Sequence, residues 1–204
     1  YIPYLLKVAK GVKLNGLKVV VDAANGALFD IAPAVFEELG AEVIRVGCEP
    51  DGININAGVG STSTGELISA VVREEAYIGF AFDGDGDRVI MVDSRGKVAD
   101  GDIILYLSAS EIRPRAVVGT IMSNLGLEEV LSSMKIGLLR VPVGDRRVYE
   151  EMKKRDLPLG GEPSGHIIFR PEVYTGDGMV TALKVLSFGE SLEHYIDSFP
   201  RYPQ

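Results

Sequence analysis

Short runs of apolar residues recur along this chain, and each is followed by a segment whose apolar positions have helical spacing. Residues 18–22 (KVVVD) form a continuous β-branched run, which is typical of a parallel strand covered on both faces. Residues 31–39 carry apolar side chains at helical spacing up to Gly40, and residues 41–46 form the next apolar run. This succession predicts a βαβ unit.

The elements that follow complete a first lobe. A further helix is predicted at residues 64–75, and the apolar run at 77–82 (YIGFAF) leads directly into an acidic loop. Residues 89–93 return as a strand, which ends in the turn at 94–97. Together these elements predict a first compact lobe of residues 15–97.

The same pattern then restarts and predicts a second lobe over residues 98–198. The runs VVVDAANG and VVGTIMSNLG, one in each lobe, are loosely similar, which suggests an internal duplication. Helices are predicted at 101–109, 127–134, 146–155 and 178–188, and strands at 116–120, 136–141 and 167–169. The fold class predicted from these patterns is α/β with two lobes.

Composition narrows the range of partners. Acidic residues outnumber basic ones 29 to 21, and no basic run appears, so we expect no nucleic-acid partner. No apolar run approaches the ~18 residues that span a bilayer, so no membrane partner is expected. The single cysteine, Cys48, cannot form an internal disulfide, which suits a cytoplasmic location, and it is interpreted as a small buried apolar side chain. The start at Tyr1, with neither an initiator Met nor a signal peptide, indicates a cut into a longer chain.

The acidic loop, residues 83–88 (DGDGDR), is the strongest candidate site. Asp83, Asp85 and Asp87 alternate with glycines, which lack a Cβ and allow the backbone to curl so that the carboxylates converge. Carboxylates this close repel one another unless a cation lies between them. Hard oxygen ligands select Mg²⁺, Ca²⁺ or Mn²⁺. We therefore predict a divalent-cation site, with Mg²⁺ as the expected ion.

The acidic loop also allows other interpretations. An EF-hand needs Gly at its sixth position and Glu at its twelfth, where this chain has Arg88 and Ser94. A Mg²⁺-dependent phosphatase with Asp83 as its nucleophile, or a solvated acidic turn, remains open. Arg88 is interpreted either as a counter-ion of the carboxylates or as a phosphate contact.

A second polar loop, residues 160–166 (GGEPSGH), precedes the strand at 167–169. Glu162 and Ser164 are spaced so that both can face one ligand, and a carboxylate is well suited to adjacent sugar hydroxyls. The alternative is a tight turn whose polar groups bind backbone donors. For His166, a hydrogen bond that stabilises the loop and a contact with the ligand are equally open.

Taken together, the two loops resemble those of the phosphohexomutase superfamily. AFDGDGDR resembles the metal-binding loop and GGEPSGH the sugar-specificity loop of that family, in the same order. The segments DGININAGVGST, VGTIMSNLGLE and VPVGDRRV are most similar to the phosphoglucosamine mutase branch. The resemblance covers nearly the whole chain and matches the second and third of the family's four domains, with a break near Val98.

This resemblance implies a fold and a reaction. The fold would be two similar three-layer α/β/α lobes with mixed, mainly parallel sheets. Mg²⁺ held by Asp83, Asp85 and Asp87 would assist phosphoryl transfer between a phosphoserine and a hexose phosphate, the expected small-molecule substrate. Arg88 would contact the phosphate, whereas the sugar would contact Glu162, Ser164 and His166.

The resemblance also implies regions that lie outside this sequence. The phosphoserine would belong to domain 1 and a phosphate-gripping loop to domain 4, so we expect this fragment to be inactive and to bind metal weakly. Residues 1–14 would then link to domain 1 and residues 199–204 to domain 4.

Three points in the sequence leave the substrate open. Pro163 replaces the Gln, Asn or Met that is common in relatives, which removes one side-chain contact to the sugar. The loop Gly144-Asp145-Arg146 is similar to another third-domain loop of the family, although Asp145 would also suit a helix N-cap. A phosphomannomutase or phosphoglucomutase is the runner-up, and a non-catalytic metal- or sugar-binding module is a further alternative.

Overall fold

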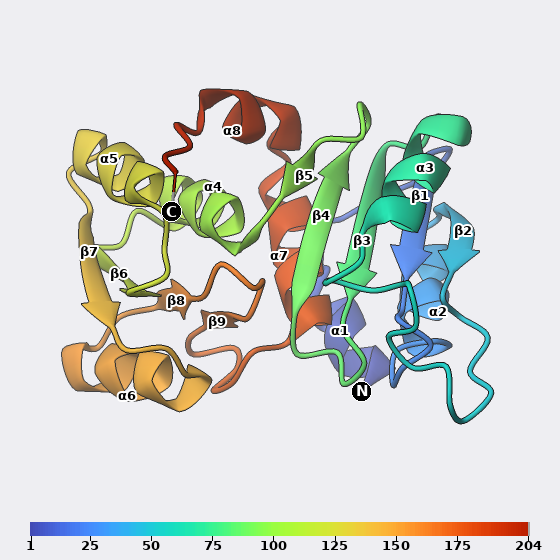
Figure 1. Cartoon of the computed structure of the whole chain (residues 1–204), viewed down its shortest axis with the longest axis horizontal. Coiled ribbons are helices and arrows are strands. Elements are labelled where there is room, and N and C mark those ends of the chain that lie inside the picture. Colours follow the sequence, from blue (N-terminus) through green and yellow to red (C-terminus); the bar gives the residue numbers. More distant parts are fainter. Residues whose placement is uncertain (204) are drawn as a thin grey trace. The chain divides into compact units, whose positions relative to one another are not determined.

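The computed structural model describes residues 1–203; Gln204, at the end of the predicted C-terminal linker, lies outside the described residues. The chain divides into two compact units. The first contains Tyr1–Val98 and Gly178–Glu190, and the second contains Ala99–Asp177 and the segment that begins at Ser191 (Figure 1). The helix after residue 177 therefore packs with the first unit, although the sequence pattern placed it within the second lobe, residues 98–198.

The sheet of the first unit is mixed. Its strands are hydrogen-bonded in the order β2-β1-β3-β4-β5. β1 is parallel to both β2 and β3, whereas β4 is antiparallel to β3. The strands are β1 (Lys18–Asp22), β2 (Glu42–Val46), β3 (Ile78–Phe82), β4 (Val89–Asp93) and β5 (Val98–Ala99).

Helices cover both faces of this sheet. On one face, Leu67 of α3 packs into a core cluster with Val20 and Ile90. On the other face, Phe36 of α2 stacks on Phe80 of β3, with ring centroids 5.0 Å apart. The helices of this unit are α1 (Ile2–Val8), α2 (Ile31–Glu38), α3 (Gly65–Arg73) and α7 (Gly178–Phe188). The result is a three-layer α/β/α unit.

The second unit repeats this strand arrangement. Its strands are hydrogen-bonded in the order β7-β6-β8-β9, with β6 parallel to β7 and β8, and β9 antiparallel to β8. The order and directions match those of β2-β1-β3-β4 in the first unit. The strands are β6 (Ala116–Thr120), β7 (Gly137–Val141), β8 (Leu159–Gly161) and β9 (Ile167–Phe169).

Helices again lie on both faces. Met152 of α6 packs with Val118 and Ile168 in a core cluster, and α4 contacts β8. The helices are α4 (Gly101–Ile112), α5 (Leu125–Ser133), α6 (Asp145–Arg155) and α8 (Leu192–Ser198). The predicted fold class, α/β with two similar three-layer lobes and mixed, mainly parallel sheets, is confirmed.

One prediction about the second polar loop was wrong. Gly160 and Gly161 were placed in the loop, whereas they form β8 and pair with Ile168 and Ile167 of β9. Strand pairing uses only the backbone, so glycines can pair without giving any apolar pattern in the sequence. Among the described residues, no helix has both the length and the apolar character needed to cross a membrane.

Candidate functional site

The acidic loop connects two fully buried strands at one end of the first sheet. β3 ends at Phe82, directly before Asp83. Phe82 pairs with Val89, the first residue of β4, so the loop begins and ends at a pair of hydrogen-bonded strands. Asp83, Asp85 and Asp87 each offer a carboxylate oxygen, and these three oxygens lie within 4.8 Å of one another. The structure thus brings together the three residues that the sequence predicted as metal ligands.

Backbone contacts fix the path of this loop. Gly86 has a φ of +79°, which a residue with a Cβ rarely adopts, and its N–H donates to the Asp83 carbonyl at 3.1 Å. The Gly84 carbonyl accepts the Ala27 N–H at 2.8 Å, while the Gly86 carbonyl accepts the Gly178 N–H at 2.9 Å. Backbone hydrogen bonds therefore hold the loop in place, together with the Arg88 N–H, which donates to Asp83 Oδ1 at 3.1 Å.

The electrostatics of the loop favour a bound cation. Burial raises the pKa of Asp83, and a hydrogen bond and the negative charge from Asp87 raise it further. Arg88 offsets part of this charge: its Nε lies 3.5 Å from Asp83 Oδ2 and 3.6 Å from Asp87 Oδ1. One guanidinium cannot balance three carboxylates, so the site keeps a net negative charge that a divalent cation would balance.

A hollow of about 410 Å³ adjoins the acidic loop. Its walls come from the loop itself and from the segment around Ile55, Asn56 and Thr62. Ile55 is 52% exposed even though it is apolar. Asp83 and Asp85 therefore line an open space beside the acidic loop.

The second polar loop lies in the equivalent place of the second unit, between β8 and β9. Its turn closes through the Glu162 N–H, which donates to the His166 carbonyl at 3.0 Å. The Pro163 carbonyl accepts the Gly101 N–H at 3.0 Å, which ties the turn to the start of α4. Glu162 is half-buried and Ser164 is exposed, so both side chains remain accessible to a ligand.

The Glu162 carboxylate has a partner that sequence analysis missed. Its Oε1 accepts the backbone N–H of Gly144 at 3.0 Å, across 18 residues of sequence. Gly144 is the N-cap of α6, with a φ of +132°. Asp145 is the first helical residue and not the N-cap that the sequence allowed. The only sign in the sequence of the contact between Gly144 and Glu162 is a glycine just before a predicted helix.

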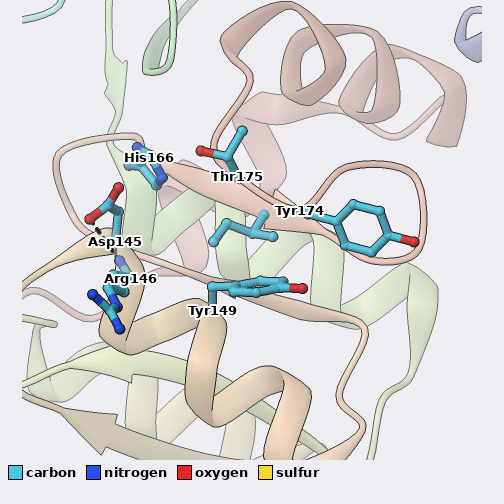
Figure 2. A pocket seen from close by; sticks show the side chains of 7 residues that line it. Asp145, Arg146, Tyr149, His166, Tyr174 and Thr175 are labelled. Atoms are coloured by element: carbon cyan, nitrogen blue, oxygen red, sulfur yellow. Dashed lines mark hydrogen bonds between the residues drawn. The ribbon is translucent and has the colours of Figure 1, made fainter.

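His166 is more deeply buried than either Glu162 or Ser164. Only 2% of its surface is exposed, and its Nε2 accepts the Gly176 N–H at 2.9 Å. The imidazole therefore anchors the loop that carries Tyr174 and Thr175. His166 also lines a cavity in this unit (Figure 2). Its contact with the substrate stays a prediction.

Comparison with known proteins places both units in one family. Residues 1–96 match the model of phosphoglucomutase/phosphomannomutase alpha/beta/alpha domain II, and residues 100–202 match that of domain III. The chain is 48% identical over 211 residues to a phosphoglucosamine mutase of Hydrogenovibrio crunogenus, covering 100% of this chain and 48% of that protein. It is 53% identical over 179 residues to that of Shewanella loihica, covering 85% and 40%.

Solved structures agree with this relationship. A phosphoglucomutase/phosphomannomutase family protein from Burkholderia thailandensis superimposes with a TM-score of 0.83 at 27% identity, covering 98% of this chain and 46% of that one. Aspergillus fumigatus N-acetylphosphoglucosamine mutase, solved with GlcNAc-6P and magnesium, shares the fold with a TM-score of 0.72 at 18% identity, covering 99% and 52%. This chain spans about half the length of the curated relatives it matches. It belongs to the phosphoglucomutase/phosphomannomutase family of the phosphohexomutase superfamily and contains that family's domains II and III.

Proposed function

We propose that this chain forms the metal-binding and sugar-binding parts of a phosphoglucosamine mutase, which interconverts glucosamine 6-phosphate and glucosamine 1-phosphate. The observation that carries the proposal is the convergence of Asp83, Asp85 and Asp87 beside Arg88. This arrangement occurs in a chain about half identical to proteins named phosphoglucosamine mutase. Phosphomannomutase or phosphoglucomutase activity is the runner-up within the same family.

The proposed ion is Mg²⁺, held by Asp83, Asp85 and Asp87. All three are hard oxygen donors, and their excess negative charge matches a small divalent cation. When bound, such an ion neutralises charge on a transferring phosphoryl group. The protein residues would hold the ion at the end of β3, on backbone bonds that do not depend on it.

Arg88 is proposed to bind the phosphate beside the metal. Its guanidinium side chain is 42% exposed, and its backbone N–H donates to Asp83 Oδ1 at 3.1 Å. The main chain therefore fixes the start of the side chain, while the planar fork remains able to reach phosphate oxygens. Both interpretations of Arg88, counter-ion and phosphate contact, are compatible with this geometry.

Glu162 and Ser164 are proposed to hold the sugar hydroxyls, with His166 beside them. The Gly144 N–H orients Glu162 and leaves its second carboxylate oxygen for the ligand. Pro163, whose carbonyl binds Gly101, contributes shape to the turn and offers no polar side chain. Because hydroxyl contacts can be remade after the sugar turns over, one loop can serve both phosphate positions.

The phosphoserine and the phosphate-gripping loop of the complete reaction are proposed to come from other regions of the whole protein. The support is that the curated relatives are about twice as long as the part matched here. The hexose phosphate would then be bound between groups from this chain and groups from those regions.

A chimera tests the proposed function. This chain would replace the matching region of the Hydrogenovibrio crunogenus phosphoglucosamine mutase, and ³¹P NMR would follow conversion of glucosamine 6-phosphate to glucosamine 1-phosphate. We expect activity that depends on Mg²⁺ and falls at least ~100-fold in Asp83→Asn, because one charged ligand is lost. Asp30→Asn, an exposed carboxylate of the same unit, is the control.

Two outcomes would contradict the proposal. A folded chimera with no isomerase activity would contradict the proposal that this chain belongs to a mutase. Release of inorganic phosphate by this chain alone, abolished by Asp83→Asn, would instead favour a phosphatase that uses Asp83 as its nucleophile.

A further inference from the structure

A buried carboxylate in the first unit, that of Asp22, takes no part in the proposed reaction. Asp22 is the last residue of β1, and its side chain is fully buried. β1 lies beside β3, the strand that leads into the acidic loop (Figure 1), and Asp22 pairs with Ala81 of β3. Burial raises the pKa of this carboxyl group more than two backbone hydrogen bonds lower it. Because burying a carboxylate is costly, its hydrogen-bond partners indicate its role.

The two oxygens of Asp22 bind two separate segments of the chain. Oδ1 accepts the Ala24 N–H at 2.9 Å, and Oδ2 accepts the Gly60 N–H at 2.7 Å. Ala24 belongs to the turn that follows β1 and has a φ of +56°, which a residue with a Cβ rarely adopts. Gly60 lies 38 residues after Asp22, in the connection between β2 and α3. The carboxylate therefore joins the turn after β1 to a distant segment.

The turn after β1 is in direct contact with the acidic loop. The Ala27 N–H donates to the Gly84 carbonyl at 2.8 Å. Gly26 packs so closely that a Cβ on it would lie 2.2 Å from the same carbonyl oxygen. The bond from Ala24 to Asp22 therefore fixes a turn whose following residues support the loop at Gly84.

The segment at Gly60 is in contact with the end of β3. The next residue, Ser61, donates its N–H to the Phe82 carbonyl at 2.9 Å, directly before the acidic loop. A Cβ on Gly60 would lie 2.7 Å from the Cβ of Ala24 and 2.9 Å from the Phe82 carbonyl oxygen, so the three segments meet here. The bond from Gly60 to Asp22 therefore supports the loop at its first end.

We propose that Asp22 is a positioning residue of the metal site: by joining these two segments, it holds the acidic loop in the geometry in which its three aspartates bind one cation. The inference rests on the proposed function and adds to it a residue that is not itself a ligand. An asparagine could accept an N–H at only one of the two positions, because its amide nitrogen is a donor. Replacing a group that orients metal ligands typically weakens metal binding by roughly 10–100-fold.

Mn²⁺ titration of this chain tests the role of Asp22. Broadening of the Gly84 and Gly86 amide resonances gives the dissociation constant, and hydrogen exchange of the metal-free chain reports on the two supporting segments. We expect Asp22→Asn to weaken Mn²⁺ binding about tenfold. In the same variant, the amides of Ala27 and Ser61 should exchange faster relative to those of β4, because one of the two segments is released.

Three further variants separate positioning from charge and from stability. Gly60→Ala keeps the charge of Asp22 but forces the same junction apart, so it should weaken Mn²⁺ binding as Asp22→Asn does. Glu66→Gln removes a negative charge that acts on Asp22 and leaves both bonds of Asp22 in place, so the affinity should stay close to that of the wild type. Val71→Ala removes methyl groups from the core of the same unit, so it should lower stability without changing the affinity.

The outcomes separate this inference from the proposed function. If Asp22→Asn and Gly60→Ala bind Mn²⁺ as the wild type does, Asp22 does not position the site, and the metal site itself stands. Equal weakening by Glu66→Gln or Val71→Ala would trace the effect to charge or stability and overturn the inference. If Asp22→Asn does not fold, the result for Gly60→Ala decides. A wild-type chain that binds no Mn²⁺ at the acidic loop overturns both the metal site and the inference.

Discussion

The two units place different chemistry at the same position of the same strand arrangement. In each unit, the candidate loop connects the third strand of the sheet to an antiparallel neighbour: β3 to β4, and β8 to β9. The acidic loop concentrates three carboxylates there, whereas the second polar loop has one carboxylate and one hydroxyl. The shared strand order therefore fixes where a functional loop lies, and the loop sequence determines what it binds.

The two loops also differ in how their functional side chains are held. Glu162 is oriented by the Gly144 N–H, so the carboxylate of the second polar loop is held by a protein contact. In the acidic loop the backbone is fixed, but burial raises the pKa of Asp83, and a hydrogen bond and the negative charge from Asp87 raise it further. We therefore expect the acidic loop to gain stability from a bound cation, whereas Glu162 is already oriented by a backbone hydrogen bond.

The largest difference that we expect between the units concerns a buried acid of the second unit, Asp102. Burial raises its pKa to about 6 from the ordinary 3.8, although the Asn124 N–H donates to it at 2.7 Å. In the folded state the Asp102 carboxyl group keeps its proton up to about pH 6, whereas in the unfolded chain it loses this proton near pH 3.8. The stability that the protonated Asp102 contributes is therefore fully present below pH 3.8, and it is lost as the pH rises from 3.8 to about 6. The loss is on the order of 3 kcal/mol.

Chemical denaturation between pH 4 and pH 7 measures this effect. In Asp102→Asn, the free energy of unfolding should fall less over this range than in the wild type, because the variant has no proton to lose. The exposed Asp156→Asn should follow the wild-type curve. Identical pH profiles for Asp102→Asn and the wild type would show that burial does not hold this proton.

A matched pair of glycine substitutions tests whether the two loops depend on equally close backbone contacts. A Cβ at Gly26 would lie 2.2 Å from the Gly84 carbonyl oxygen, and one at Gly101 would lie 1.9 Å from the Glu162 carbonyl oxygen. Each backbone must shift, so we expect Gly26→Ala and Gly101→Ala to destabilise the protein by about 1–3 kcal/mol in urea denaturation.

The control for this pair is Gly65→Ala in the first turn of α3. A Cβ there meets nothing within 4 Å, so the substitution should be neutral or stabilising by about 0.5 kcal/mol. Hydrogen exchange would locate the damage: faster exchange near residues 83–88 for Gly26→Ala and near residues 162–166 for Gly101→Ala. The contrary result is the same exchange pattern in both variants.

Magnesium should stabilise the first unit and leave the second unchanged. With a dissociation constant near 1 mM, 10 mM Mg²⁺ adds about 1.4 kcal/mol by mass action. Hydrogen exchange measured with and without Mg²⁺ gives the stability of each unit separately, from the amides of β3 in the first unit and of β8 in the second. Asp85→Asn should remove the gain in β3, whereas Asp30→Asn should keep it. Equal stabilisation of β8 would indicate a general salt effect.

The sequence predicted those parts of the fold and site that are local. β1 and β3 were found because they are buried apolar runs, and the aspartates because they alternate with glycine within six residues. β8 was missed because Gly160 and Gly161 have no apolar side chains.

Contacts between distant residues could not be predicted. The bond from Gly144 to Glu162 crosses 18 residues, and the Gly178 N–H reaches the Gly86 carbonyl from the far end of the chain. Both use backbone groups, which every residue type carries, so no residue pattern identifies them. For the same reason, the packing of α7 with the first unit follows from the tertiary fold and not from its apolar sequence.

The most direct test of the central claim is paramagnetic relaxation by Mn²⁺, which has the same preference for hard oxygen ligands as Mg²⁺. Amide resonances of this chain would be recorded at substoichiometric Mn²⁺. The account predicts broadening centred on Gly84 and Gly86, competed by Mg²⁺ and lost when Asp83, Asp85 and Asp87 are all replaced by Asn. Broadening that is spread over other acidic surfaces, or that persists in the triple variant, would contradict it.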